Sequence, residues 1–543
     1  MVVAVETESV EQKVESQPAP PVVQNSKSHQ SLVLTTIMIS TFMAVLDATI
    51  VNVALAKLTV AFGTSTDLVA WVLTGYMLAF AVMLPTSAWI ADRFGYKATY
   101  IAGVVIFTFG SFLCSISWNI VSLIIFRVVQ GVGGGLVQPV GMAIVTREFP
   151  PERRGMALGF YGIAASASIA LGPTLGGYLI DNFSWQMIFD VNVPVGVAGV
   201  IMAYIVLHEH RNEHRPPLDA VGFLGMSIFL TGVLLGLAEG NASWNTDGWG
   251  STFEVVCFSL GAAGLVAYVL SAFFGKHPLI DLRLFKDWDF ALSNVVLFVF
   301  GLGMFGSVFL LPLYLQNSLG YTPLQTGLLF LPMGLMTAVF APISGILTDK
   351  VGARVPLAIG MTLLALSMFQ YRTLSLLSEG LDILVPLYIR GIGMGLVFTP
   401  ISAVALSQIP RAKMGQASGI INVVRQIGGS FGVALFGTML LREQALYSNT
   451  FGEAMSRFSP AFRNAVAGLA HFAQRATGGT YTSAVNKAQA VLIGNMETQA
   501  FIASIDKIFL VASMIIVATV IPVLLLKETH RSTPKTGAPP VMD

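Results

Sequence analysis

The feature that most constrains this chain is a series of long apolar windows, each of the length that crosses a bilayer as a helix. A helix needs about 20 predominantly apolar residues to span the hydrocarbon core. Only 11% of the residues are charged, whereas soluble domains carry about 25%. The sequence therefore predicts an all-α, polytopic membrane protein and excludes a soluble globule. Fourteen windows are expected to span, near residues 33–56, 69–90, 98–117, 119–145, 156–180, 186–207, 219–238, 253–274, 292–315, 323–347, 353–372, 381–407, 415–440 and 506–526.

The composition also excludes several classes of function. The formal net charge is +1, so the sequence has no basic excess that would indicate nucleic-acid binding. Both cysteines, Cys114 and Cys257, fall in apolar spans, and neither a disulfide framework nor a metal cluster is expected. The sequence contains no nucleotide-binding loop and no catalytic triad. We therefore expect no metal, no organic cofactor and no enzyme activity.

Lysine and arginine gather in alternate loops, as Arg93 and Lys97 do after the second span. The intervening short loops hold almost none, and 181–185, 239–251 and 316–322 contain no Lys or Arg. Cytoplasmic loops carry the excess of basic residues in membrane proteins. With an even number of spans, this bias predicts that both termini are cytoplasmic, as tails at 1–31 and 527–543. The first tail is polar and is expected to be disordered.

Two patterns recur at an offset of about 260 residues. The glycine-rich stretch 131–137 matches 391–397, and the turn 91–97 matches 348–354. Spans 1–6 therefore correspond to spans 9–14, with spans 7 and 8 as an insertion. Two repeated six-helix bundles indicate a rocking transporter with its site between the halves. The predicted division is an N-terminal bundle at 32–207, a linker with two extra spans at 208–275 and a C-terminal bundle at 276–526.

A carboxylate, Asp47, lies inside the first span. A charge at that depth costs several kcal/mol unless it is paired, hydrated or protonated. Arg127 in the fourth span is predicted to lie at equal depth, roughly 14–15 Å from the outer end of its helix at 1.5 Å per residue. An Asp beside an Arg changes its proton affinity when the contact is broken or remade. We hypothesise that Asp47 carries the proton and Arg127 modulates it; the alternative is a static structural ion pair.

Four motifs, in spans 1, 4 and 5 and in the loop after span 2, then identify a family: 46–54, 92–97, 127–133 and 172–177. Over residues 33–526 the chain resembles the major facilitator superfamily, specifically the fourteen-span drug:proton antiporters of the EmrB/QacA type. The resemblance implies proton-coupled multidrug efflux by alternating access across the cell inner membrane. It also implies a proton gradient in place of a cofactor, and the lipid bilayer, protons and a lipophilic small molecule as partners.

The loop motif occurs in two copies. Its candidate residues are Asp92, Arg93, Gly95 and Lys97 in the first copy and Asp349, Gly352 and Arg354 in the second. The family's leading glycine is replaced by Ala88 in the first copy, while the second keeps Gly345. The resemblance implies that this loop stabilises one conformation. Charged turns that only set the topology are the alternative.

The fifth span carries the antiporter-type motif, with Gly172, Pro173, Gly176 and Gly177 as candidate residues. Small residues let helices approach closely, and proline favours a kink. We expect a tight, bending contact between the two bundles here. Ordinary packing of small residues is the alternative.

Further polar residues are candidates for the substrate cavity or its gates: Gln130, Gln138, Tyr314, Gln316, Arg390, Arg425 and Gln426. Arg390 and Arg425 are expected near mid-span, where a buried arginine needs a partner. Asp47, backbone carbonyls or an anionic ligand could serve. The substrates are therefore lipophilic drugs or, alternatively, anionic lipophiles such as fatty acids, bile-salt-like compounds or siderophores. A third alternative is a membrane sensor or scaffold without transport.

The segment 441–504 is long, polar and placed outside by the predicted topology. Apolar residues recur in it at helical spacing, which predicts a pair of amphipathic helices at the outer face. The resemblance to EmrB-type pumps implies a periplasmic adaptor protein and an outer-membrane channel as partners here. A membrane-surface hairpin without a partner is the alternative.

Overall fold

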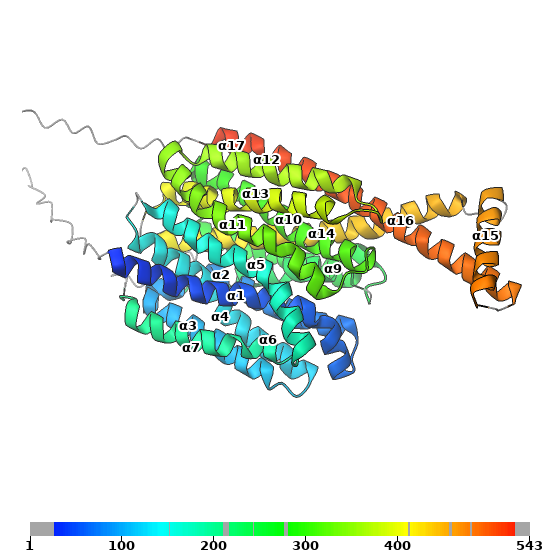
Figure 1. Ribbon diagram of the computed structural model, residues 1–543. Helices are drawn as coiled ribbons and strands as arrows, with labels where there is room; N and C mark the ends of the chain where they lie inside the picture. The colour runs from blue at the N-terminus through cyan, green and yellow to red at the C-terminus, as the bar shows by residue number, and fades with distance from the viewer. Residues whose placement is uncertain are drawn as a thin grey trace, which may run out of the picture.

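The computed structural model describes residues 27–150, 153–209, 217–242, 244–275, 281–410, 413–454, 459–477 and 480–526. In these ranges every regular element is a helix (Figure 1). Twelve helices are long and apolar enough to cross a membrane. The chain is thus a multi-pass, all-helical membrane protein. Most of the two predicted tails lies outside the described residues, but the first helix begins earlier than expected, at Lys27.

Each of the fourteen predicted spans falls on helix, yet two of these helices are not among the twelve. One is helix α5 (Arg154–Asn182). The other, helix α12 (Arg354–Gln370), has only 17 residues. The count of fourteen spans therefore stays a prediction.

The first six predicted spans pack together as one bundle, in which α1 lies against α5 and α7, and α4 against α2 and α3. Its helices are α1 (Lys27–Phe62), α2 (Thr66–Phe94), α3 (Tyr96–Ser115), α4 (Ile120–Glu148), α5, α6 (Met187–Asp190) and α7 (Asn192–Val206). Local sequence sets the ends of these helices. Ser65 caps α2 by accepting from the Leu68 N–H, and Asn119 and Ser122 form a capping box at α4, as short polar side chains do at N-termini.

The insertion is a hairpin of α8 (Ala220–Glu239) and α9 (Thr252–Phe274), joined through the short helix η2 (Gly248–Gly250). Glycines let the two helices touch: a Cβ on Gly225 or Gly232 would lie within 3 Å of the α9 backbone. The hairpin packs against α2 and α14. It therefore covers one seam between the two halves.

The second half repeats the first. Its helices are η3 (Leu282–Lys286), α10 (Trp288–Asn317), α11 (Pro323–Val351), α12, η4 (Tyr371–Thr373), α13 (Gly380–Ser407), α14 (Met414–Ala454), α16 (Tyr481–Ala518) and α17 (Val520–Leu525). The halves meet along two seams, α5 against α11 and α2 against α14. Because α2 and α5 correspond to α11 and α14 in the repeat, the two seams are equivalent by pseudo-symmetry.

A helical arm projects from the end of the bundle opposite to the start of α1 and to α17 (Figure 1). It consists of the end of α14, α15 (Pro460–Thr477) and the start of α16. Val466 and Ala470 of α15 are buried against Ala484 and Ala488 of α16. The second helix predicted in this segment is part of α16, which runs unbroken into the last span for 38 residues, because no proline interrupts it.

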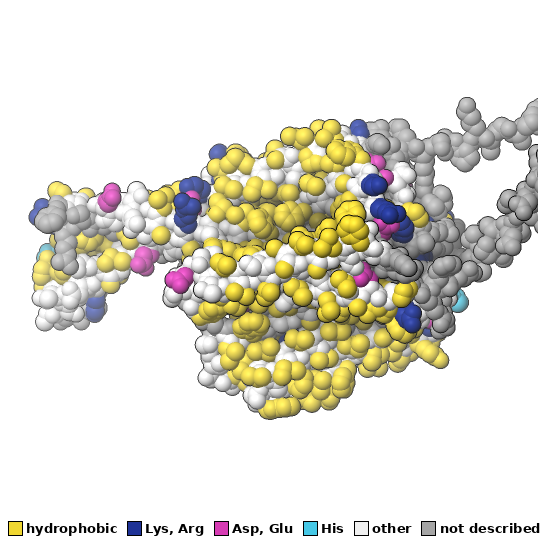
Figure 2. All heavy atoms as spheres, turned by 180° about the vertical axis from the view of Figure 1, so that it is seen from behind, with side chains coloured by type: hydrophobic (Ala, Val, Ile, Leu, Met, Phe, Trp, Pro, Cys, Tyr) yellow, Lys and Arg dark blue, Asp and Glu magenta, His cyan; other side chains and the backbone are white. Residues whose placement is uncertain are grey.

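The bundle surface is apolar around its middle. Figure 2 shows a broad belt of hydrophobic side chains, with Lys and Arg gathered towards the ends of the bundle and along the arm. Large side chains such as Phe109, Ile205 and Phe274 are more than half exposed. Such a belt would be a liability in water and fits a bilayer as the surrounding solvent.

Candidate functional site

The Asp47 carboxylate is paired inside the first bundle. Its Oδ2 accepts from Arg127 Nη1 at 2.5 Å, and its Oδ1 accepts from Gln130 Nε2 and from Asn192 Nδ2, each at 2.9 Å. Among the described residues, Asp47 and Arg127 form the one ion pair in which both side chains are fully buried. The predicted pairing of these two residues is therefore present.

A second layer of contacts fixes the groups that hold Asp47. Arg127 Nε donates to the Val72 carbonyl at 3.2 Å and Arg127 Nη1 also donates to Gln130 Oε1 at 2.7 Å. The guanidinium lies 4.1 Å from the centre of the Tyr76 ring, a favourable position for a cation. Asn192 Nδ2 also donates to Ser111 Oγ at 3.0 Å. Helices α1, α2, α3, α4 and α7 thus all contribute to one network.

The sequence places these groups through helix geometry and one helix break. Arg127 and Gln130 are three residues apart and share a face of α4. Asn192 begins α7 directly after the four-residue helix α6, and it is buried. Arg127 Nη2 has no partner, so the site holds one spare donor.

The fifth-span glycines lie beside this site, but most do not face the other half. A Cβ on Gly172 would lie 2.0 Å from Thr49 Oγ1, and a Cβ on Gly176 would lie 2.9 Å from Ile50 Cγ1. Both therefore pack against α1, within the same bundle, and Pro173 lies between them in α5. Gly177 faces Leu324 of α11. The expected contact between bundles is made by Gly177 and by Gly155 and Gly159 near the start of α5.

Three other candidates meet across the seam between the halves. Arg425 Nη2 on α14 donates to Gln138 Oε1 on α4 at 3.4 Å and to Asn422 Oδ1 at 3.0 Å. Gln426 Nε2 contacts Met77 Sδ on α2 at 3.2 Å. Arg425 Nε has no partner. Gln138, Arg425 and Gln426, here called the seam cluster, thus form a polar group where α4 and α2 meet α14.

The remaining candidates lie apart from both clusters. Arg390 is fully buried within the second bundle, where its Nη2 donates to the Met304 carbonyl at 3.5 Å. Tyr314 donates to the Ser375 carbonyl at 2.7 Å, in the turn that precedes α13. Gln316, near the end of α10, is exposed. The structure does not bring these three residues together with the seam cluster.

The two copies of the loop motif form the same turn. Gly95 and Gly352 end α2 and α11 with φ of 104° and 97°, a conformation that glycine adopts at little cost. Lys97 Nζ donates to the Tyr204 carbonyl at 2.7 Å and Arg354 donates to the Leu526 carbonyl. Each basic residue therefore ties its turn to the chain at the end of its own bundle. Arg93 is exposed.

The two motif carboxylates lie near helix starts in the opposite half. A Cβ on Gly155, at the start of α5, would lie 2.6 Å from Asp349 Oδ1. Asp92 Oδ1 accepts from the Tyr96 hydroxyl at 2.8 Å, and a Cβ on Gly415, at the start of α14, would lie 2.8 Å from that same hydroxyl oxygen. Helix N-termini favour nearby negative charge.

A further link ties the segment before α10 to the start of α14. Asp281 Oδ2 accepts from Lys413 Nζ at 2.6 Å, and the Asp281 N–H donates to Gln416 Oε1 at 3.2 Å. Burial by itself raises the pKa of Asp281, but the bonds from Lys413 and the Arg283 N–H outweigh it and hold that pKa below its usual value.

Sequence reasoning missed four members of the Asp47 network: Asn192, Ser111, Tyr76 and Cys114. Cys114 Sγ contacts Gln130 Oε1 at 3.7 Å. Asn192 had a usable signal, because an asparagine in an apolar window needs a polar partner. The other three residues are common in apolar helices and carry no such signal.

Comparisons with known proteins bear on the family and the fold of the chain. The family model of the Major Facilitator Superfamily matches residues 37–433. The chain is 33% identical to the uncharacterized MFS-type transporter YhcA of Bacillus subtilis, over 82% of this chain and 84% of that protein. It is 30% identical to the multidrug export protein EmrB of Haemophilus influenzae, over 89% of this chain and 93% of that protein. Among solved structures, the proton:xylose symporter XylE has a TM-score of 0.58 at 12% identity, covering 93% of this chain and 97% of that one.

Proposed function

Because the chain belongs to the major facilitator superfamily, and is therefore a transporter, we propose that it exports lipophilic compounds in exchange for protons. Similarity to a protein named as a multidrug export protein supports the substrate class. The arrangement of two repeated bundles around two seams supports alternating access as the mechanism.

The observation that carries the proposal is the fully buried Asp47 carboxylate with its three nitrogen donors. Protonation of Asp47 removes the negative charge that compensates Arg127. Arg127 keeps Gln130 Oε1 and the Val72 carbonyl as acceptors, so it can stay in place when the carboxyl is neutral. The contacts that weaken are those that join α1 and α7 to α4.

Helix α4 also reaches the seam cluster. Gln138, which bonds to Arg425, lies eight residues beyond Gln130, about 12 Å along the helix axis. One helix therefore connects the proposed proton site with the path between the halves. Asp47 is the proton carrier in this proposal, Arg127 its modulator, and Gln138, Arg425 and Gln426 contact the substrate or gate its path.

The test is transport in proteoliposomes with an imposed pH gradient. Wild type should release protons when a lipophilic drug is added, and Asp47→Asn should abolish both this signal and gradient-driven efflux. Asp247→Asn, which changes an exposed carboxylate in the α8–α9 turn, is the matched control and should behave as wild type. Full gradient-driven transport by Asp47→Asn would overturn the assignment.

A second candidate, the export of anionic lipophiles, is favoured by Arg425. Its Nε is without a partner and it lies at the seam, where an anionic group of a substrate would find a donor. Arg425→Gln should then reduce transport of anionic compounds much more than transport of cationic ones. Equal effects on anionic and cationic compounds would leave only the first candidate, the export of lipophilic drugs.

We also propose the membrane arrangement that the basic loops indicate. Both termini lie in the cytoplasm, all fourteen predicted spans cross the inner membrane, and the arm of α14, α15 and α16 projects outside. The position of the arm opposite the starts of α1 and α17 supports this orientation (Figure 1). The arm is then the surface for a periplasmic adaptor protein, which would join the pump to an outer-membrane channel.

A further inference from the structure

The second bundle contains an uncompensated buried charge. Arg390 is fully buried, and its Nε and Nη1 have no partner. Its one hydrogen bond is the long contact to the Met304 carbonyl. A guanidinium is always charged in proteins, and no carboxylate of the described residues forms an ion pair with it. Arg390 lies ten residues into α13, about 15 Å from its start, so the charge lies deep in the bundle.

The internal repeat shows which group is absent. The match of 131–137 with 391–397 places Arg390 opposite Gln130, which in the first bundle donates to the Asp47 carboxylate. The two repeat offsets, 257 and 260 residues, place the counterpart of Asp47 between residues 304 and 307, a Met-Phe-Gly-Ser stretch without an acid. Arg390 reaches this same stretch of α10. The second bundle therefore carries a cation where the first has Gln130, and it has no acid on the matching stretch of α10.

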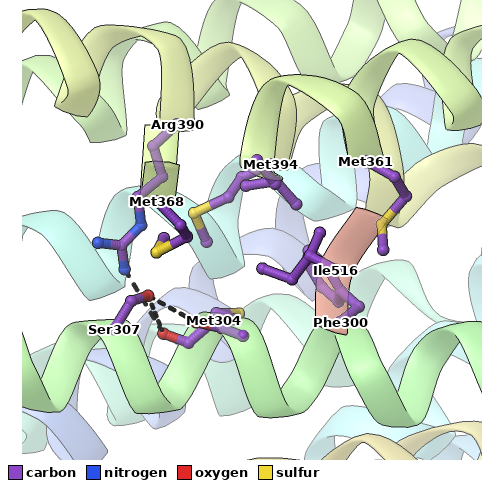
Figure 3. A pocket seen from close by; sticks show the side chains of 10 residues that line it. Phe300, Met304, Ser307, Met361, Met368, Arg390, Met394 and Ile516 are labelled. Atoms are coloured by element: carbon purple, nitrogen blue, oxygen red, sulfur yellow. Dashed lines mark hydrogen bonds between the residues drawn. The ribbon is translucent and has the colours of Figure 1, made fainter. Parts of the chain in front are cut away.

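A small cavity lies beside the guanidinium (Figure 3). It has a volume of about 10 Å³, close to one water-sized sphere. Residues of α10, α12, α13 and α16 line it, all within the second bundle, so it is separate from the seam cluster. The lining includes Ser307, whose hydroxyl donates to the Gly303 carbonyl at 2.6 Å and would have to turn to donate into the cavity. It also includes four methionines, which adapt their shape readily: Met304, Met361, Met368 and Met394.

We propose that this cavity binds one monatomic anion, chloride under physiological conditions, held by Arg390 Nε and Nη1. The anion takes the place of the carboxylate that Asp47 supplies in the first bundle. The cavity is too small for the carboxylate end of a lipophilic substrate, whereas the small expansion that chloride needs beyond a water is within the reach of the flexible methionines. A single water would fill the space but would leave the charge uncompensated, which is costly in a low-dielectric interior.

The test is a thermal-unfolding titration of the purified full-length protein in sodium gluconate, with chloride or bromide replacing gluconate at constant ionic strength. A ligand at about ten times its Kd should raise the Tm of a chain of 543 residues by roughly 1 °C. We expect a saturable rise for wild type and none for Arg390→Gln, which installs the residue found at the matching position of the first bundle. Arg372→Gln, an exposed arginine of the same half, should keep the rise.

In gluconate alone, Arg390→Gln should be at least as stable as wild type, because it removes an uncompensated charge. If Arg390 only holds Met304 in place, Arg390→Gln should be less stable than wild type in every salt. That result would overturn the proposal. Absence of any halide effect in wild type, or an equal effect in Arg390→Gln, would also overturn it. Anomalous scattering from bromide beside Arg390 in crystals would locate the ion directly. None of these readouts depends on transport or proton coupling.

Discussion

The strength of the Asp47–Arg127 pair can be measured by a double-mutant cycle. Breaking a buried ion pair by removing one partner costs about 3–5 kcal/mol, because the other charge stays buried alone. Asp47→Asn puts an amide against Arg127 Nη1, where the present distance is 2.5 Å, so two donors would face each other. We expect a cost near the top of that range, about 4–5 kcal/mol.

Arg127→Gln should cost less, about 3 kcal/mol, because Asp47 keeps the donors of Gln130 and Asn192 at 2.9 Å. The double variant, Asp47→Asn with Arg127→Gln, removes both charges and leaves two amides that can bond to each other. Replacing both partners of a buried pair is often close to neutral, so we expect a cost of about 1–2 kcal/mol. The coupling free energy should therefore be about 5–7 kcal/mol.

The assay is equilibrium unfolding in mixed micelles, followed by the fluorescence of the seven tryptophans. The pair Lys507–Glu443, at 2.7 Å and partly exposed, is the matched control, and its coupling should be far smaller because water screens it. If the cost of the double variant equals the sum of the two single costs within about 0.5 kcal/mol, the argument that Asp47 and Arg127 form a direct, buried pair is refuted. A stable double variant that has lost gradient-driven transport would separate the role of Asp47 in transport from its role in folding.

Three further predictions use other parts of the molecule. Gly172→Ala should lower thermal stability and abolish transport, because the new Cβ would lie 2.0 Å from Thr49 Oγ1. The control Gly468→Ala, whose Cβ would have nothing within 4 Å, should raise thermal stability slightly. Equal effects of the two substitutions would refute the contact. Asp281→Asn should lower the free energy of unfolding by up to about 1 kcal/mol at pH 7. Unfolding measurements at a series of pH values test how this deficit depends on pH. Since the folded pKa of Asp281 is lowered, its stabilisation is complete above the unfolded value of about 4 and is lost as the pH falls through the folded pKa, so the deficit should close below about pH 4. Deleting 445–500 should reduce both efflux in cells and co-purification of an adaptor, and a variant unchanged in both would exclude a coupling role for the arm.

Much of the fold follows from the sequence because the bilayer leaves few choices. Each apolar window had to become a helix, since an unpaired backbone group in lipid costs several kcal/mol. The repeat was readable because its two turns need glycine, and Gly95 and Gly352 both have positive φ. The pairing of Asp47 with Arg127 was predictable from depth alone, as two opposite charges in one apolar bundle have strong reason to meet.

Sequence reasoning failed where the outcome depends on how helices rotate against their neighbours. Gly172 was expected between bundles, yet it faces Thr49 of its own bundle, and a stripe of small residues does not tell which neighbour it faces. Arg390 was grouped with Arg425 as a cavity residue, but it points into the second bundle. Asn192 was missed because its position depends on the break between α6 and α7, which hydropathy does not register.

The glycines of α4 decide how a change at Asp47 can travel. A Cβ on Gly131 would lie 2.5 Å from the Tyr76 carbonyl on α2, and a Cβ on Gly133 would lie 2.3 Å from the Phe107 nitrogen on α3. With backbones this close, α4 cannot slide or turn independently, so α2, α3 and α4 must move as one body. That body contacts α1 and α7 through the Asp47 network on one side, and α14 through Gln138 and Met77 on the other. In the proposed mechanism, protonation of Asp47 would weaken the first set of contacts and so loosen the body that forms half of the seam.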